Sequence, residues 1–347
     1  MHQQRIASVP LTGLFILAIL YATHVAKPVL MPVVLAVLLA ILLAPLVSLF
    51  ERIGAPRALG AGFTVMLLVG LTAWGASRLL DPAAGWLADA PGLLSDVQEK
   101  IASLQGQVEQ VSAAAEQVGE ITRGGASETQ KVTVEEEAPS AAVLRGATGI
   151  ITTGVLTLAL LFFLLSSGEL FLLKLVRVLP GYSARKRAIQ SAAAVRRNLS
   201  THLLTITAIN TALGIAVSLA LSAVGMPNPV LWGVMAGILN YVPYLGAMVG
   251  VGVVTVIAIT TIDTLGLALL VPFIYLALTA LEGTIVTPAI LGARLRLNPV
   301  AIFLGVILWG WLWGVPGALL AVPILTTLKV IADAYPRFMA FGEFLGR

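Results

Sequence analysis

The sequence predicts an all-α polytopic membrane protein: about eight membrane helical segments, including two helical hairpins broken by proline and glycine, and a small extracytoplasmic helical domain. Hydrophobic residues make up 58% of the 347 residues and charged residues only 11%, and the mean hydropathy is +0.97. A soluble domain carries about 25% charged residues, so a surface with so few charges suits lipid. Long apolar stretches recur along the chain, and the basic and acidic residues between them fall in separate segments.

Six apolar stretches have the length of one membrane crossing, for which a helix needs about 20 apolar residues. They are 9–26, 28–50, 60–80, 147–166, 203–224 and 264–281. Lys27-Pro28 separates the first two. The first stretch lacks a small-residue cleavage site followed by a polar region, so we interpret it as an anchor and not as a signal peptide.

Two further stretches, 229–261 and 299–332, are too long for one straight crossing. A helix of about 33 residues reaches about 50 Å, against a hydrocarbon core of about 30 Å. Proline removes a helical hydrogen bond, glycine weakens a helix, and backbone groups freed in the membrane must be buried or solvated. Such residues stand near the middle of both stretches: Pro243 and Gly246 in the first, and Gly314, Pro316, Gly317 and Pro323 in the second. We predict two helical hairpins or broken helices; two kinked, tilted spans are the alternative.

Charge distribution predicts the orientation. Segment 81–146 holds eleven acidic and four basic residues, whereas 167–202 holds seven basic residues and one acidic residue. Because cytoplasmic loops are enriched in Lys and Arg, we predict that 51–58, 167–202 and both termini are cytoplasmic and that 81–146 is extracytoplasmic. This orientation also places Arg294 and Arg296 in the cytoplasm if 229–261 returns to the side from which it enters, and it keeps the C-terminus there if 299–332 does the same.

The chain is accordingly divided into 1–80 (transmembrane helices), 81–146 (extracytoplasmic), 147–202 (one span and a basic region) and 203–347 (transport core). From Leu94 to Val118, apolar residues recur at alternating spacings of three and four, which predicts an amphipathic helix from Pro91-Gly92 to Gly119. Residues 122–142 have the composition of a linker. The basic region is predicted to lie as an amphipathic helix on anionic lipid, with a regulatory arm as the alternative.

Few ionisable residues fall in apolar segments, where such groups by default mark transport pathways. Glu282 is the strongest candidate, with a helix cap or an interfacial position as its alternative role. We expect Lys27 and Lys329 to reach the membrane interface and Asp263 to cap a helix. Donors and acceptors for a neutral solute lie near the predicted breaks, at Asn240, Tyr241, Tyr244, Thr284, Thr287 and Asn298. Trp309, Trp311 and Trp313 are predicted to belong to an interfacial aromatic belt.

Other function classes lack their signatures. The chain contains no cysteine and no G-x-x-x-x-G-K-[ST] loop, which argues against disulfides, thiolate metal sites and ATP drive within this chain. Its three histidines are scattered, and no Ser/His/Asp arrangement stands out. We therefore expect no enzyme activity, cofactor, metal site or nucleic-acid partner.

At three segments, 231–250, 281–302 and 314–331, the sequence resembles the autoinducer-2 exporter (AI-2E) family of bacterial membrane proteins. The family's Pro-Tyr-x-Gly break is matched by Pro243, Tyr244 and Gly246, and its Glu-Gly followed by Pro is matched by Glu282, Gly283 and Pro288. Its last Gly/Pro-rich hairpin is matched by Gly314, Gly317 and Pro323. The sequence departs from the family where Thr279 or Ala280 replaces a common Gln, where Asn298 replaces a frequent His, and where a usual Gly-Gln is absent around Ser200-Thr201.

The resemblance implies a multi-pass protein of the bacterial inner membrane, in contact with lipid, that forms a homo-oligomer such as a pentamer. It further implies export of a small polar signal such as autoinducer-2, or exchange of Na⁺ or Li⁺ for protons. A non-transporting membrane scaffold organised by the extracytoplasmic helix is the alternative outside transport. The candidate solute or ion pathway comprises Asn240, Tyr241, Pro243, Tyr244, Gly246, Glu282, Gly283, Thr284, Thr287, Pro288, Asn298, Pro299, Gly314 and Gly317.

Overall fold

The computed structural model of the chain describes residues 2–116, 139–168, 170–178, 181–291, 297–335 and 338–346. Within these ranges the regular structure is helical, apart from one isolated bridge between Leu297 and Gly346. The helices are α1 (His2–Val25), α2 (Lys27–Arg52), α3 (Arg57–Glu116), α4 (Pro139–Ser167), α5 (Leu170–Val178), α6 (Tyr182–Ala223), α7 (Pro229–Leu239), α8 (Leu245–Thr261), α9 (Leu265–Leu281), the π-helix η1 (Glu282–Val286), α10 (Thr287–Leu291), α11 (Pro299–Trp313), α12 (Val315–Ala334) and α13 (Met339–Leu345).

Five helical segments among the described residues are long and apolar enough to cross a bilayer. They are Lys27–Arg52, Arg57–Leu93, Arg185–Ala223, Leu265–Leu291 and Val315–Asp333. Shorter apolar helices accompany them, and large apolar side chains such as Phe15 and Trp74 are exposed on the outside of the molecule. The chain is therefore a polytopic membrane protein, as its composition predicts, because a surface of this kind is stable in lipid and not in water.

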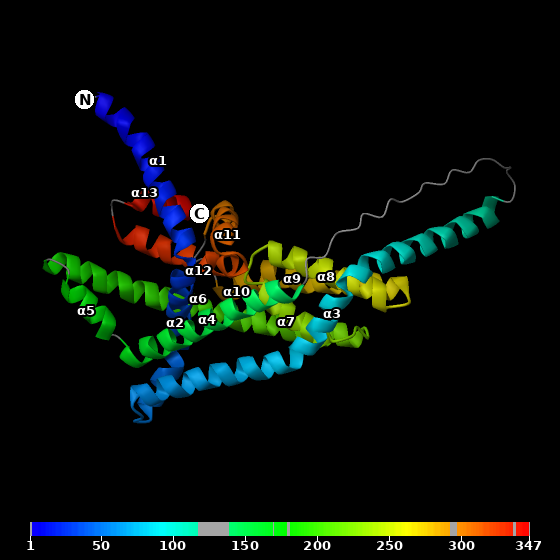
Figure 1. Cartoon of the computed structure of the whole chain (residues 1–347), viewed down its shortest axis with the longest axis horizontal. Coiled ribbons are helices and arrows are strands. Elements are labelled where there is room, and N and C mark those ends of the chain that lie inside the picture. The colour runs from blue at the N-terminus through cyan, green and yellow to red at the C-terminus, as the bar shows by residue number, and fades with distance from the viewer. Residues whose placement is uncertain are drawn as a thin grey trace.

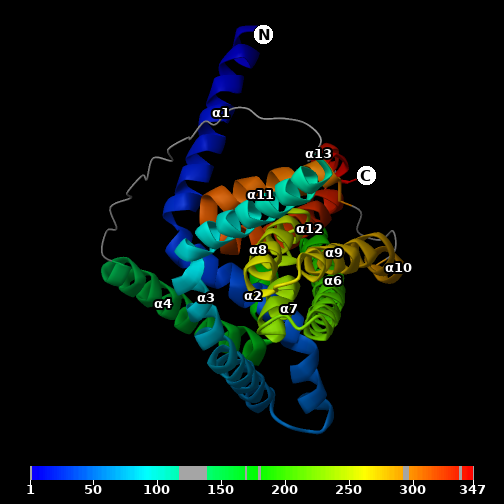
Figure 2. The same cartoon turned by 90° about the vertical axis from the view of Figure 1, so that its right-hand side faces the viewer.

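The N-terminal helices divide where the sequence predicts. α1 ends at Val25 and α2 begins at Lys27, with Pro28 in its first turn. α1 projects from the other helices (Figures 1 and 2) and is held by its last turn, where the Trp313 indole donates to the Thr23 carbonyl at 3.3 Å.

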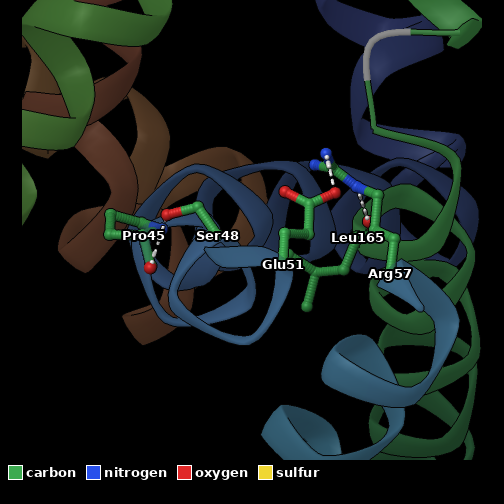
Figure 3. A network of polar contacts seen from close by, with 5 residues as sticks. All are labelled: Pro45, Ser48, Glu51, Arg57 and Leu165. Carbon is green, nitrogen blue, oxygen red and sulfur yellow. Dashed lines mark hydrogen bonds and ion pairs between the residues drawn. The ribbon is translucent and has the colours of Figure 1, made fainter. Parts of the chain in front are cut away.

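Helices α2, α3 and α4 pack around a core that includes Val47 and Leu161. Beside this core, the Arg57 Nε donates to the Leu165 carbonyl at 2.8 Å, and its Nη1 lies 3.0 Å from Glu51 Oε1 (Figure 3). Arg57 thus joins the turn between α2 and α3 to the end of α4.

Helix α3 corrects the predicted element boundaries, because it runs unbroken from Arg57 to Glu116 through both the predicted third span and the described part of the predicted amphipathic helix. It contains Pro82 and Pro91, and Figure 1 shows it changing direction along its length. Proline bends a long helix without ending it when neighbouring helices hold both halves. Trp86 packs on Trp232 of α7, and Lys100 Nζ donates to the Ile262 carbonyl at 2.8 Å.

The rest of the predicted extracytoplasmic region is described only in part. Residues 117–138, which hold the end of the apolar seam and most of the predicted linker, lie outside the described residues, and so do the side chains of the seam at Leu94 and beyond Lys100.

The predicted basic region comprises the short α5 and the first half of α6, and α6 continues without a break through the predicted fifth span. Figure 1 shows α5 and the turn between α2 and α3 toward one end of the molecule, and the second half of α3 at the opposite end. The described end of the acidic segment in α3 and the basic helix α5 thus lie toward different ends of the molecule, while the assignment of these ends to the two sides of a membrane stays a prediction.

Both long apolar stretches are interrupted, as predicted. α7 and α8 are separated by residues 240–244, where Tyr244 has a φ of 64°, and α11 and α12 are separated by Gly314, with a φ of 74°. Pro323 lies inside α12 and does not break it. With eleven and fifteen residues, α7 and α11 are roughly 16 and 22 Å long, too short to cross a hydrocarbon core of about 30 Å alone.

Candidate functional site

A seam of glycines brings α6 and α7 unusually close. A Cβ on Gly233 would lie 2.3 Å from the Gly214 carbonyl oxygen, and one on Gly237 would lie 2.9 Å from the carbonyl oxygen of Asn210. Only residues without a side chain allow backbones to approach so closely, a packing that membrane helices commonly use. The seam sets Asn240, at the end of α7, beside Asn210 of α6.

Tyr275 and Thr279 of α9 and Glu282, the first residue of η1, follow one another at spacings of four and three and therefore share a helix face. Tyr275 is buried, and its hydroxyl lies 2.0 Å from where a Cβ on Gly250 would stand, so the glycine in α8 makes room for the ring. Thr279 is also buried and donates to the Tyr275 carbonyl at 2.9 Å. This packing turns the side chain of Glu282 inward.

At Glu282 the helix changes to the π-helix η1, which ends at Val286. In an α-helix, residues five apart point roughly 140° away from each other, whereas a π turn aligns them. The Thr287 hydroxyl consequently reaches Glu282 Oε1 and donates a hydrogen bond to it. The helical segment continues to Leu291, so Glu282 lies inside a candidate span and not beyond its end. The predicted end of this span at 281 is thus corrected.

Four polar side chains from these elements form one hydrogen-bonded group, called here the Asn–Glu cluster: Asn210, Asn240, Glu282 and Thr287. The Asn240 amide donates to Asn210 Oδ1 at 2.9 Å and to Glu282 Oε2 at 3.1 Å. Asn240 therefore links α6 to η1, and both carboxylate oxygens of Glu282 have a donor. Glu282 is half-buried and occupies the C-cap position of α9, where the π-helix begins.

A second polar pair continues the cluster along α6. The hydroxyls of Thr207 and Tyr241 lie 2.8 Å apart. Tyr241 follows Asn240 in the sequence, and Thr207 lies about one helical turn before Asn210 on α6. Thr207, Asn210 and Gly214 recur at spacings of three and four, so the face of α6 that packs on α7 is also its polar face.

The charge of Glu282 is not balanced by a cation within the described residues, because its partners there are a neutral amide and a neutral hydroxyl. A carboxylate inside an apolar segment is costly unless it is protonated or paired. The cluster can thus donate and accept hydrogen bonds, exchange a proton at Glu282, or supply oxygen atoms to a cation.

The first break also touches α11 and α12. Val242, in the break, packs with Val306 of α11 and Ala321 of α12. A Cβ on Gly317 would lie 2.0 Å from the Trp309 carbonyl oxygen, so α11 and α12 are themselves in close contact. The break at 240–244 is therefore bordered by α6 on one side and by α11 and α12 on another.

The remaining predicted pathway residues do not join the cluster. Tyr244 is exposed, and the Thr284 hydroxyl donates to the Ala280 carbonyl at 2.6 Å. The Asn298 side chain accepts a hydrogen bond from Val300 N at 3.0 Å, so it caps α11, in which Pro299 is the first residue. The others are glycines and prolines, which have no polar side chain. They lie at the first break (Pro243 and Gly246), on the exposed side of η1 and α10 (Gly283 and Pro288) and at the second break (Gly314 and Gly317).

The structure also describes the tryptophans, Asp263 and Lys329, for which the sequence predicts roles outside the pathway. Trp313 is buried, and Trp309 packs against it at a ring distance of 4.9 Å, so these two rings belong to the core and not to an interfacial belt. Trp311 is exposed and stacks on His24. Thr264, not Asp263, occupies the N-cap position of α9, without a side-chain hydrogen bond. Lys329 Nζ pairs with Asp333 at 2.9 Å.

Sequence reasoning missed Asn210 and Thr207, because both lie in the middle of a stretch that it treated only as a span. A usable signal exists: an Asn in an apolar segment is rare unless it is paired, and Gly214 stands one turn away on the same face. The partner of Asn210, however, comes from a different helix.

Comparison with known proteins identifies a family to which this chain is similar. Residues 14–337 match the family described as AI-2E family transporter. The AI-2 transport protein TqsA of Escherichia coli is 32% identical over 176 residues, which are 49% of this chain and 51% of TqsA. A Borreliella burgdorferi protein is 28% identical over 57% of this chain and 55% of its own length, and YrrI of Bacillus subtilis is 34% identical over 34% and 33%. The matched regions thus span from about a third to just over half of these relatives.

Proposed function

The chain belongs to the AI-2E family of transporters, and on this premise we propose that it is a secondary transporter that exports a small polar solute. Autoinducer-2 is the first candidate, because TqsA, which is similar over half of this chain, is named for AI-2 transport. In this proposal the solute passes the Asn–Glu cluster and the break at 240–244, and the elements around the break move against the rest of the chain.

The Asn–Glu cluster is the observation that carries the proposal. It gathers a carboxylate, two amides and a hydroxyl from α6, the end of α7, η1 and α10 in otherwise apolar segments. Polar groups in such segments are expensive and mark pathways, and irregular backbone at membrane depth lines cavities or is buried in protein. Broken helices that present free backbone groups are where transporters bind their cargo.

One feature favours a second candidate, a Na⁺ or Li⁺/H⁺ antiporter. Glu282 has only neutral partners among the described residues, and a carboxylate of this kind can exchange a proton for a cation. In that case the oxygen atoms of Asn210, Asn240 and Thr287 supply further ligands, since hard cations prefer oxygen.

Flux through proteoliposomes separates these functions. Purified full-length protein is reconstituted, and the movement of labelled autoinducer-2 and of Na⁺ is measured with and without a pH gradient. The variant is Glu282→Gln, which keeps the shape and removes the charge. The control is Asp263→Asn, the same change at an exposed acid in the turn before α9.

For the exporter, we expect autoinducer-2 flux in the wild type and in Asp263→Asn. For the antiporter, we expect Na⁺ flux driven by the pH gradient, reduced at least a hundredfold in Glu282→Gln and unchanged in the control, a loss of about 2.7 kcal/mol or more. Folded, reconstituted protein that moves neither substrate would contradict both transport functions and favour a membrane scaffold.

A further inference from the structure

A pocket of about 320 Å³ lies between α6 and α7, beside the glycine seam. Asn210, Gly214 and Ser218 of α6 line one side of it, and Gly233, Gly237 and Tyr241 line the other. The glycines let the two backbones touch, and the pocket lies beside that contact. None of the residues that line the pocket carries a charge, and most of its surface is apolar.

Asn210 gives this pocket a specific polar feature. The residue is only 2% exposed, its Oδ1 accepts a hydrogen bond from Asn240, and its Nδ2 is buried without an acceptor. A buried donor without an acceptor is rare in folded proteins and calls for an explanation. Asn210 lines the pocket, so a small shift of its side chain would bring this donor against an acceptor atom of a bound molecule.

The size and charge of the pocket limit the ligand. At about 30 Å³ for each water-sized group, the pocket holds a molecule of roughly ten such groups, at the small end of ligand sites. An ion would lose its hydration without meeting an opposite charge on the lining residues, which is unfavourable. An uncharged molecule with an apolar body matches the mostly apolar lining of the pocket, and an oxygen atom on it can accept a hydrogen bond from Asn210.

The geometry points to this pocket as the binding site for a small, uncharged solute whose carbonyl, ether or hydroxyl oxygen accepts a hydrogen bond from Asn210 Nδ2. The inference rests on the proposed transport function, whose substrate class it narrows. Asn240 connects the site to Glu282, because the same amide group donates to Asn210 and to the carboxylate. Solute bound at Asn210 and a proton or cation at Glu282 would therefore act on one shared side chain.

The test measures binding to full-length protein in lipid nanodiscs by saturation-transfer NMR, with the signal from empty nanodiscs subtracted. The probes are cyclopentanone and methylenecyclopentane, which share a ring and differ in an oxygen acceptor against a methylene group. For Asn210→Leu, we expect cyclopentanone affinity to fall about tenfold, as for the loss of one buried hydrogen bond, and methylenecyclopentane affinity not to fall. An equal effect on both probes, or none on cyclopentanone, overturns the inference.

A second pair of variants keeps the test informative if Asn210→Leu does not fold. Ile215 is exposed and lines the pocket, whereas Leu219, one turn further along α6, is exposed and does not. Ile215→Trp should abolish binding of both probes, and Leu219→Trp should leave it unchanged. Equal binding to the two variants, or mass spectrometry showing a retained lipid in the pocket instead, contradicts a solute site.

Binding needs no gradient, so flux without pocket binding refutes only this inference, and pocket binding without flux refutes only the transport function.

Discussion

Gly317 offers a direct test of how closely α11 and α12 must pack. The residue lies in the first turn of α12, just after the break at Gly314, and it faces the last turn of α11. A Cβ there would stand 2.0 Å from the Trp309 carbonyl oxygen and 2.8 Å from Trp313 Cβ. The atoms in its way are backbone and the base of a side chain, which cannot rotate aside.

The cost of Gly317→Ala follows from this geometry. Relieving the contact requires a separation of about 1.5 Å, the shortfall between 2.0 Å and an ordinary contact of about 3.5 Å. Overpacking of this kind costs about 1–3 kcal/mol. Gly310 provides the matched control on the opposite helix, because its added Cβ would lie 3.6 Å from Ala318 Cβ, an ordinary contact. Gly310→Ala should stabilise the protein by about 0.5–1 kcal/mol through helix propensity alone.

The assay is thermal unfolding of the purified protein in one detergent at a fixed scan rate, since membrane proteins often unfold irreversibly. We expect Gly317→Ala to lower the Tm by roughly 2–10 °C and Gly310→Ala to leave it unchanged or raise it slightly. If the two substitutions shift the Tm equally, or if Gly317→Ala has no effect, the close approach of α11 and α12 is not required and the argument is wrong.

Two further predictions concern single contacts. Thr207→Val and Tyr241→Phe remove the same 2.8 Å hydrogen bond, so a double-mutant cycle on unfolding should show a coupling of about 0.5–1.5 kcal/mol; strictly additive effects would show that the hydroxyls do not interact. Arg57→Lys cannot keep both the bond to the Leu165 carbonyl and the pair with Glu51, so it should destabilise the protein by about 1 kcal/mol. Arg52→Lys, at an exposed neighbour, should stay within about 0.5 kcal/mol, and an equal loss in both variants would contradict the role of Arg57.

The sequence predicts the helix breaks well because their causes are local. Tyr244 follows a proline in a turn that brings Gly246 against the Leu239 carbonyl, and Gly314 takes a positive φ that suits glycine. The same local reasoning begins a separate helix at Pro91-Gly92, whereas α3 runs through this point. A proline bends rather than ends a helix when packing holds both of its sides, as α7 and α8 do for α3.

The candidate site was predictable in part. Glu282, Asn240 and Thr287 stand out in the sequence as polar residues near a glycine and a proline, and the structure brings them together. Asn298 and Thr284 have the same residue types, yet Asn298 caps a helix and Thr284 bonds to its own helix. Residue type and position along the chain do not distinguish these cases, because the difference lies in the direction in which each side chain points.

By itself, the sequence determined that this protein lies in a membrane and where its two long apolar stretches are interrupted. Both depend on the composition of single segments: few charges, long apolar runs, and prolines and glycines within them. The tertiary structure alone decided which polar groups meet. The contact of α6 with α7 through Gly214, Gly233 and Gly237 and the π turn after Glu282 set the distances in the Asn–Glu cluster. Distances between separate helices depend on how their surfaces fit, and no single segment carries that information.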